Sequence, residues 1–278
     1  MKKINRRSFL AAAGLTAAAL ALTACGGSAS STASSTASSA ASSEAASTSA
    51  AAELTTVEAG KLTMATNAAF PPYEMTTDAG EFEGIDIDTA QAIADKLGLE
   101  LQIDDMDFDA ALLSVQQGKA DIVMAGVTVT DERKAVMDFS DSYATGIQSI
   151  IVPEGSDITS PDDLAGKKIG TQRGTTGYIY CSDDFGDDAV VAYDDGLTAV
   201  QALNNGQVDA VVIDNAPAQE FVAANPGLVI LDTSYAEEDY AIGLAKGSAL
   251  EDAVNAALEE LKADGTLQSI VDKYITAE

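Results

Sequence analysis

The sequence contains no histidine, two cysteines and few basic residues. Without histidine, the chain can form neither a histidine-based catalytic triad nor a histidine-ligated metal site. Its 15 Lys and Arg residues stand against 44 Asp and Glu residues, which gives a net charge of −29. A surface of that charge repels phosphate backbones and anionic lipid headgroups, so the composition argues against nucleic-acid binding.

The apolar run near the N-terminus is too short to be a convincing membrane span. Residues 1–24 begin with four basic residues and continue with the alanine-rich run Phe9–Ala24. Leu22–Cys25 resembles a bacterial lipobox, in which the cysteine is lipidated, and Arg6–Leu10 resembles a twin-arginine export signal. We therefore predict a lipoprotein signal peptide over residues 1–24 and a lipid on Cys25. The Sec and twin-arginine routes both stay open.

Residues 25–56 consist almost wholly of Ser, Ala and Thr after Cys25, a composition that cannot bury enough apolar surface to fold. We interpret them as a flexible tether of roughly 30 Å, with a glycan-bearing stalk as the alternative. Without residues 1–24 the chain keeps 11 basic and 44 acidic residues, a net charge of −33. If Cys25 carries lipid, Cys181 is the only thiol left, and a structural disulfide is excluded.

Arginine is nearly absent from the rest of the chain, where only Arg133 and Arg173 remain. Thr130 is placed to cap a short helix, so Arg133 would lie in the first turn, where a cation is unfavourable against the helix dipole. Its partner is either a surface carboxylate or, as the sharper hypothesis, a ligand carboxylate that the planar guanidinium holds. Gly126, which ends the apolar strand predicted over Asp121–Ala125, would let the backbone approach such a ligand closely.

One pattern occurs twice. Residues 111–126 are echoed by residues 199–214 at an offset of 88 residues: a helix, a glycine, a turn with Asp and an apolar strand. The echo predicts two similar lobes, and its register places Gly126 of the first opposite Asp214 of the second. Asp214 would cap the next helix, bind a ligand, or do both. An acid at a strand end of one lobe, facing an arginine loop of the other, would match a zwitterion.

Periodicity and end signals predict the main elements. We expect a strand over Lys61–Thr66 and a helix over Asp86–Leu97 that Gly98 ends. Two further strands, over Ile147–Pro153 and Tyr240–Lys246, would cross between the lobes. Two crossings indicate a hinge.

Two motifs that suggest other ligands are rejected. The acidic run Asp104–Asp109 lacks the Gly and Glu that an EF-hand loop needs at its sixth and twelfth positions, where this chain has Ala110 and Gln116. The Gly-rich turn Gln172–Gly177 offers N–H groups to an anion but has neither P-loop nor GxGxxG spacing. The sequence therefore predicts no metal and no cofactor.

Six segments carry a family resemblance: Asn67–Glu74, Gly84–Asp88, Gly126–Arg133, Asp138–Ser140, Arg173–Thr176 and Ile213–Asp214. Together they resemble the amino-acid-binding solute-binding proteins of ABC importers, the polar amino acid family, over about residues 57–278. The resemblance implies an α/β, two-lobed, periplasmic-binding-protein-like (type II) fold, in which each lobe is a mixed sheet flanked by helices and two hinge strands join the lobes. Lobe 1 would comprise residues 57–146 and 243–278, and lobe 2 residues 147–242.

Matched position by position, the resemblance also implies a ligand site. Arg133 would hold the α-carboxylate with help from Thr128 and Thr176. The α-ammonium would be received by Gly126 and Asp214. The side chain of the ligand would meet four further residues: Phe70 and Phe108, which would sandwich it, with Asn67 and Gln172.

Asn67 is the chief departure from the family pattern, because many relatives have Asp at this position. Both Asn67 and Gln172 are neutral amides, whereas a cation in a closed cleft needs a compensating carboxylate. We therefore expect a neutral polar amino acid such as glutamine rather than arginine or lysine. Glu74, Glu83 or Asp86 would reverse this expectation if one of them reached the side chain of the ligand.

The resemblance implies a monomeric, lipid-anchored binding protein on the extracytoplasmic face of the bacterial cell membrane, which delivers a free polar amino acid to the transmembrane subunits of an ABC permease. One alternative is an enzyme on the same fold, of the cyclohexadienyl or prephenate dehydratase type, although no catalytic constellation favours it. The other alternative is a sensor-type binding domain. We disfavour it because no second membrane segment precedes Glu278. The number of membranes in the envelope and the roles of Arg173 and Cys181 stay open.

Overall fold

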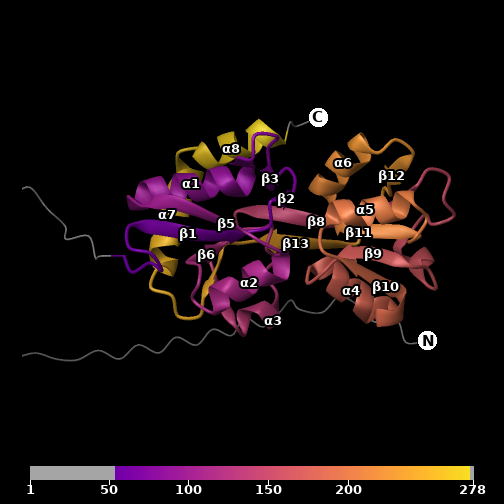
Figure 1. The fold of residues 1–278 in the computed structure, drawn as a ribbon, viewed down its shortest axis with the longest axis horizontal. Helices are drawn as coiled ribbons and strands as arrows, with labels where there is room; N and C mark the ends of the chain where they lie inside the picture. Colours follow the sequence, from indigo (N-terminus) through magenta and orange to yellow (C-terminus); the bar gives the residue numbers. More distant parts are fainter. Residues whose placement is uncertain (1–53, 276–278) are drawn as a thin grey trace, which may run out of the picture. The chain divides into compact units, whose positions relative to one another are not determined.

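The structure of the protein, a computed structural model, describes residues 54–275. The predicted signal peptide, Cys25 and the tether up to residue 53 lie outside the described residues. Within the described part, no helix is both long and apolar enough to span a membrane. Two mixed sheets dominate this part, with two long strands running between them (Figure 1).

The first sheet has the strand order β5-β1-β6-β14-β7. Strand β1 is parallel to β5 and β6, and β14 is antiparallel to β6 and β7. Helices α1, α7 and α8 pack on one another over one face, and α2 and α3 lie on the other (Figure 1). The elements are β1 (Lys61–Thr66), α1 (Ile85–Leu97), β5 (Glu100–Asp105), α2 (Phe108–Gln116), β6 (Ile122–Val123), α3 (Asp131–Lys134), β7 (Met137–Phe139), β14 (Gly243–Ala245), α7 (Glu251–Ala263) and α8 (Thr266–Tyr274).

The second sheet has the order β10-β9-β11-β8-β12, and β13 also pairs with β8. Strand β9 is parallel to β10 and β11, whereas β8 is antiparallel to β11, β12 and β13. Helices α5 and α6 cover one face and α4 the other (Figure 1). The elements are β8 (Ala144–Pro153), η1 (Pro161–Leu164), β9 (Ile169–Gln172), α4 (Thr176–Phe185), η2 (Asp187–Ala189), β10 (Val190–Tyr193), α5 (Gly196–Asn204), β11 (Ala210–Asp214), α6 (Asn215–Ala224), β12 (Leu228–Ile230) and β13 (Ala236–Tyr240).

A small antiparallel sheet lies beside the first one and leads into α1. It has the order β2-β3-β4, formed by β2 (Ala69–Phe70), β3 (Glu74–Thr76) and β4 (Phe82–Glu83). Its register places Phe70 opposite Glu74. One buried hydrophobic cluster contains residues from the α1 side of the first sheet and from the α5–α6 side of the second, together with Tyr73 and Tyr240.

End signals in the sequence explain where the helices begin and end. Helix α1 ends at Gly98, whose φ of 69° is left-handed and whose N–H bonds the carbonyls of Ala94 and Asp95. Thr130 caps α3, because its hydroxyl accepts from the N–H of Arg133. Both predictions are confirmed.

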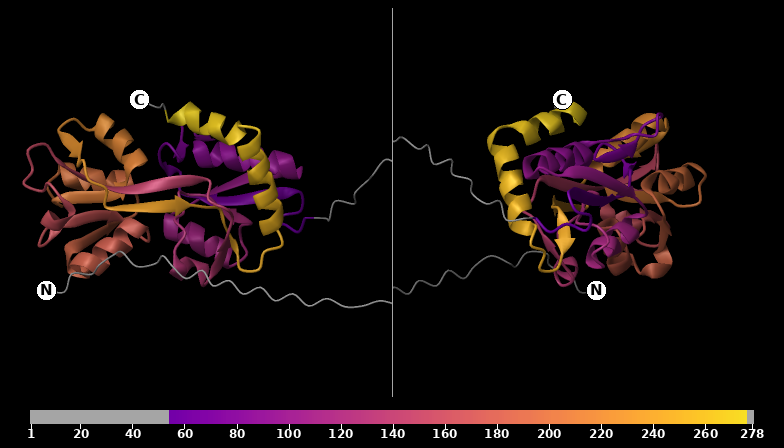
Figure 2. Two further views of the ribbon diagram at one scale, coloured as in Figure 1. Left: turned by 180° about the vertical axis from the view of Figure 1, so that it is seen from behind. Right: turned by 60° about the vertical axis from the view of Figure 1, so that its left-hand side comes forward.

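The two connecting strands differ from the prediction in length and place. Strand β8 begins at Ala144, three residues before the predicted start. The second crossing is β13 (Ala236–Tyr240), so the prediction of one strand over Tyr240–Lys246 is wrong. After Tyr240 the chain leaves β13 and enters the first sheet as β14. There β14 is hydrogen-bonded to β6 on one side and to β7 on the other. Figure 2 shows β8 and β13 lying side by side between the sheets.

Candidate functional site

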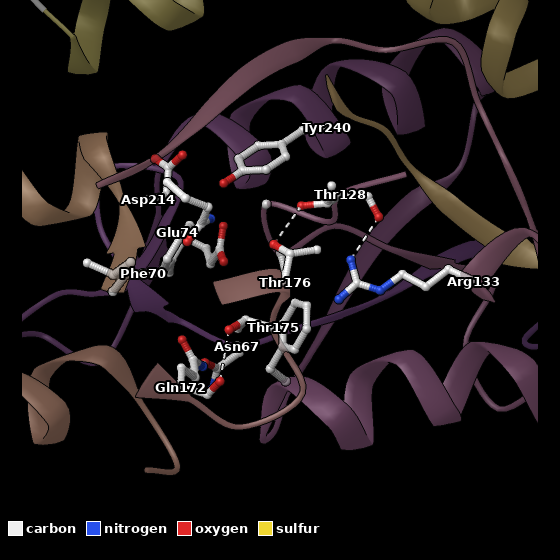
Figure 3. Close-up of a pocket in the computed structure, with 15 residues that line it drawn as sticks. Asn67, Phe70, Glu74, Thr128, Arg133, Gln172, Thr175, Thr176, Asp214 and Tyr240 are labelled. Carbon is white, nitrogen blue, oxygen red and sulfur yellow. Dashed lines mark hydrogen bonds between the residues drawn. The ribbon is translucent and has the colours of Figure 1, made fainter. Parts of the chain in front are cut away.

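A pocket opens where the two sheets face each other, beside β8 and β13 (Figure 3). The free space between its walls, the mouth included, amounts to about 390 Å³. Both sheets contribute polar side chains to it. The lining residues are Asn67, Phe70, Glu74, Phe108, Ala125, Gly126, Thr128, Arg133, Gln148, Gln172, Thr175, Thr176, Ile213, Asp214 and Tyr240.

Arg133 lies inside the pocket wall rather than on the surface, with 8% of the residue exposed. Its Nη1 donates to the carbonyl of Thr128 at 2.7 Å, and its Nη2 donates across the cleft to the carbonyl of Gly174 at 3.1 Å. The guanidinium also lies over the ring of Phe108, 5.4 Å from the centroid. Among residues 54–275 no carboxylate forms an ion pair with it, so the surface salt bridge is not its role.

The charge of Arg133 is therefore only partly compensated. Burial lowers the pKa of the guanidinium, and Glu238 is the first of the charged neighbours that counteract this. A guanidinium carries five N–H donors, and two carbonyl contacts leave donors for an anion in the pocket. Thr128 and Thr176 add hydroxyl groups beside it, with their Oγ1 atoms 3.4 Å apart across the cleft.

Asp214 ends β11 and begins α6, and only 2% of it is exposed. Its Oδ1 accepts from the N–H of Ala216 at 3.0 Å, which caps the helix, and its Oδ2 accepts from the N–H of Ile147 at 2.7 Å. Burial raises the pKa of Asp214 to about 6, against the opposing effect of these N–H groups and of the Tyr240 hydroxyl. Asp214 therefore caps a helix and also lines the pocket.

Two further carboxyls lie at the same end of the site. Asp86 is fully buried, and its Oδ2 accepts from the N–H of Gly126 at 3.0 Å. Glu74 lines the pocket, is fully buried, and has no hydrogen-bond donor on either oxygen other than its neighbour Asp86. Burial, and next the charge of Asp86, raise the pKa of Glu74 well above its usual range, and burial raises the pKa of Asp86 to about 6. Each of two adjacent buried carboxyls disfavours the ionised form of the other.

At another end of the pocket, two amides meet across the cleft (Figure 3). The Nε2 of Gln172 donates to the Oδ1 of Asn67 at 2.8 Å, and the Nδ2 of Asn67 donates to the carbonyl of Met106 at 2.9 Å. Phe70 stacks on Tyr73 with the ring centroids 5.8 Å apart. The charged side chains among the lining residues are Glu74, Arg133 and Asp214.

All nine residues that the sequence predicts for the ligand site line this one pocket. Their roles toward a ligand stay predictions. The sequence reasoning missed Gln148, Thr175 and Tyr240, which lie on or beside the connecting strands and the turn before α4. A signal for Gln148 was present, because it is a polar residue within the apolar strand β8.

Arg173 and Cys181 do not contribute to the pocket. Arg173 is half exposed and pairs with Asp194 at 3.4 Å. Cys181 is a buried free thiol in α4, and burial raises its pKa to about 12, which makes it unreactive. No group of three or more potential metal ligands is present among the described residues.

Comparisons with known proteins place the chain among binding proteins. Residues 62–277 match the model of the bacterial extracellular solute-binding proteins, family 3. The "Probable histidine-binding protein" of Neisseria gonorrhoeae is 32% identical over 99% of this chain and 98% of its own. The structure of the arginine-, lysine-, histidine-binding protein ArtJ from Geobacillus stearothermophilus matches with a TM-score of 0.75 and 34% identity, over 78% of this chain and 96% of that one. An ancestral arginine-binding protein bound to glutamine matches with a TM-score of 0.75 and 42% identity, over 78% and 99%.

Proposed function

The chain belongs to the bacterial extracellular solute-binding proteins, family 3, and we propose that its pocket captures one free amino acid for an ABC importer. Membership of this family confirms three predictions: the two-lobed α/β fold, the resemblance to amino-acid-binding proteins, and a binding protein rather than an enzyme. A family of extracellular proteins also confirms that the protein works outside the cytoplasm.

One observation carries the proposal: a buried guanidinium and a buried carboxylate line the same pocket from opposite sides of the cleft. Arg133 comes from α3, which packs beside the first sheet, and Asp214 from the end of β11 in the second. A zwitterion places its carboxylate at the first and its ammonium at the second, and each contact replaces the water that both groups lose on burial. We assign the carboxylate to Arg133, Thr128 and Thr176, and the ammonium to Asp214 and the carbonyl of Gly126.

For the ligand side chain we propose the amide end of the pocket. Glu74 lines the pocket. Burial raises the pKa of the Tyr73 hydroxyl, and the charges of Asp214, Asp86 and Glu74 raise it further. The three acids are therefore grouped around Tyr73, and in Figure 3 Asp214 lies apart from Asn67 and Gln172. Amides hydrogen-bond a neutral polar group fully, whereas a cation there lacks a carboxylate. A neutral polar amino acid such as glutamine fits best.

Arginine is the second candidate, and the comparisons favour it. The similar structures are named for arginine binding, and one of them, an ancestral arginine-binding protein, holds glutamine. The carbonyl oxygens of Asn67 and Gln172 can both accept from a guanidinium, provided that their direct hydrogen bond breaks. Phe70 and Phe108 would then stack on the guanidinium plane, as arginine does on aromatic rings.

We further propose that lipid on Cys25 anchors the protein outside the cell membrane, that residues 25–56 act as a tether, and that a monomer delivers its ligand to the permease. The lobes of the proposal are residues 57–146 with 243–278, and residues 147–242. Replacement of Cys25 by Ser tests the anchor, because the variant should leave the membrane fraction in which the wild-type protein stays.

A thermal-shift screen of the twenty amino acids tests the proposed function. A ligand at 100 times its Kd stabilises the protein by roughly 2.7 kcal/mol. We expect the largest rise in Tm with glutamine, a smaller one with arginine, and none with the deaminated acid of either. If no amino acid raises Tm, the proposed function is wrong. If arginine gives the larger rise, only the assignment of the side chain is wrong.

A further inference from the structure

Glu238 is a buried acid directly behind the pocket that the proposed roles leave unused. It lies in the connecting strand β13, is 5% exposed, and is not one of the lining residues. Its Oε2 accepts from Thr128 Oγ1 and from Gln148 Nε2, both at 3.0 Å. Its Oε1 is buried and accepts no hydrogen bond from residues 54–275. Glu238 therefore contacts two pocket residues through a single oxygen, Thr128 in the loop between β6 and α3 and Gln148 in β8.

The charge of Glu238 reaches both ends of the site. Among the charges near Arg133 it has the largest favourable effect, and it also raises the pKa of Asp214. No hydrogen bond within the described residues joins Glu238 to Arg133. The carboxylate therefore acts on the guanidinium through its charge alone and occupies none of its N–H donors. A ligand carboxylate at Arg133 would then lie near a second negative charge.

Glu238 also affects the binding of the ligand carboxylate through the hydroxyl proton of Thr128. The Thr128 hydroxyl has one proton, and a carboxylate can only accept. While Thr128 donates to Glu238, it cannot donate to a ligand carboxylate. The other hydroxyl nearby, that of Thr176, is 3.4 Å away and is itself needed by the ligand. Glu238 and the ligand carboxylate therefore compete for the same proton.

We propose that Glu238 is a positioning residue that weakens the hold of the site on the ligand α-carboxylate, because it takes the hydroxyl proton of Thr128 and adds a negative charge beside Arg133. The inference rests on the proposed function. A carrier must release its ligand, and release is faster when binding is less tight. A residue that weakens binding therefore suits a carrier. The competition for the Thr128 proton is confined to the carboxylate end of the ligand.

Glu238→Gln is the direct test, because an amide removes the charge and keeps both contacts. With its NH₂ in the place of Oε2, the new amide donates to the hydroxyl of Thr128 and, once the Gln148 amide turns over, to the Oε1 of Gln148, which frees the Thr128 proton for the ligand. Glu237→Gln is the matched control, since Glu237 is the exposed neighbour in the same strand. Calorimetry with L-glutamine and L-arginine should give a Kd about tenfold lower for Glu238→Gln, the size of one hydrogen bond to a charged group, and an unchanged Kd for Glu237→Gln.

A second ligand pair separates this role from a structural one. L-Glutaminamide and L-argininamide keep the ammonium and the side chain but have no α-carboxylate, so their Kd should change less than twofold in Glu238→Gln. If Glu238→Gln does not fold, Glu238→Met replaces it, with the same direction expected. An amino-acid Kd that is unchanged or higher in the folded variant overturns the inference, as does an equal gain for the amides. Absence of any amino-acid binding to the wild-type protein would instead overturn the proposed function.

Discussion

The two halves of the internal repeat fold alike up to the end of their strands and differ after it. In the first half, helix α2, Gly118 and β6 lead to Gly126, and in the second, helix α5, Gly206 and β11 lead to Asp214. The two glycines between helix and strand have φ values of 65° and 66°. The scaffold is thus repeated, whereas the first strand is followed by a loop that leads to Arg133 and the second ends at Asp214.

The two halves differ in the element that comes directly after the strand. After Gly126 the chain runs through a loop to α3, which carries Arg133 into the pocket. After β11 the chain enters α6 at once, so its last residue, Asp214, caps that helix. The first half has an acid in a similar place, but Asp86 comes from α1 and contacts the N–H of Gly126. The same topology therefore offers a cation on one side and an anion on the other.

Arg133→Ala should have the largest effect on amino-acid affinity, because it removes the cation that the first half supplies. We expect amino-acid binding to fall several hundredfold or more, because removal of one partner from a desolvated, hydrogen-bonded charge pair costs roughly 3 to 5 kcal/mol. Arg173→Ala is the control, since Arg173 is half exposed and pairs with Asp194 outside the pocket. Calorimetry should find wild-type affinity for the control. Near wild-type affinity in Arg133→Ala, with the fold intact by circular dichroism, would sink the assignment.

Asp214→Asn acts on the opposite charge and should have a smaller effect. Asparagine caps helices as well as aspartate does, so α6 should keep its start, while the N–H of Ile147 loses its acceptor and the free energy of unfolding should fall. The ammonium loses a charge-assisted hydrogen bond worth about 1.5 to 3 kcal/mol, and the Kd should rise roughly ten- to hundredfold. Equal affinities of the variant and the wild-type protein would show that the ammonium binds elsewhere.

The pH dependence of Asp214 separates binding from stability. Its pKa is about 6 in the folded protein, above the ordinary value of 3.8, so protonation favours the folded state. From pH 6 down to pH 4 the ligand-free protein should gain up to roughly 1.4 kcal/mol per pH unit from this group, and Asp86 acts in the same direction. Binding should weaken over the same range, since the neutral acid no longer attracts the ammonium. Comparison of urea unfolding and calorimetry between wild type and Asp214→Asn isolates both slopes, and parallel profiles would contradict the assignment.

Local signals explain why much of the site could be predicted. Thr130 and Gly98 mark helix ends by chemistry that acts within a few residues, and the repeat fixes the register that brings Gly126 and Asp214 to strand ends. Arg133 stands out because arginine is so scarce. These signals depend only on the neighbouring sequence.

Contacts over long separations could not be predicted in the same way. Glu238 meets Thr128 over 110 positions, and its buried oxygen gives no local pattern, because the strand around it reads as an acidic segment. The crossing strand was placed too late because Tyr240–Lys246 is more apolar than Ala236–Tyr240, whereas pairing with β8 decides where the strand runs. Glu74 likewise lies in a short strand whose burial depends on α1 and the pocket.

The smallest expected effect tests the repeated scaffold itself, at Asp121 and its echo Asp209. Each of these residues ties the start of the neighbouring parallel strand: Asp121 accepts from the N–H of Thr63 at 2.8 Å, and Asp209 from the N–H of Lys168 at 2.8 Å. Asp121 is 6% exposed and also accepts from the N–H of Val57 at 2.7 Å, whereas Asp209 is exposed.

Replacement of either by Asn removes the charge from these hydrogen bonds. We expect Asp121→Asn to lower the free energy of unfolding by about 2 kcal/mol and Asp209→Asn by less than 1 kcal/mol, because water compensates an exposed group and not a buried one. Neither variant should change the Kd for an amino acid, since both residues lie at the ends of their strands away from the pocket. Urea unfolding measures the difference, and equal losses in the two variants would show that the burial of Asp121 adds nothing to the contact that the two halves share.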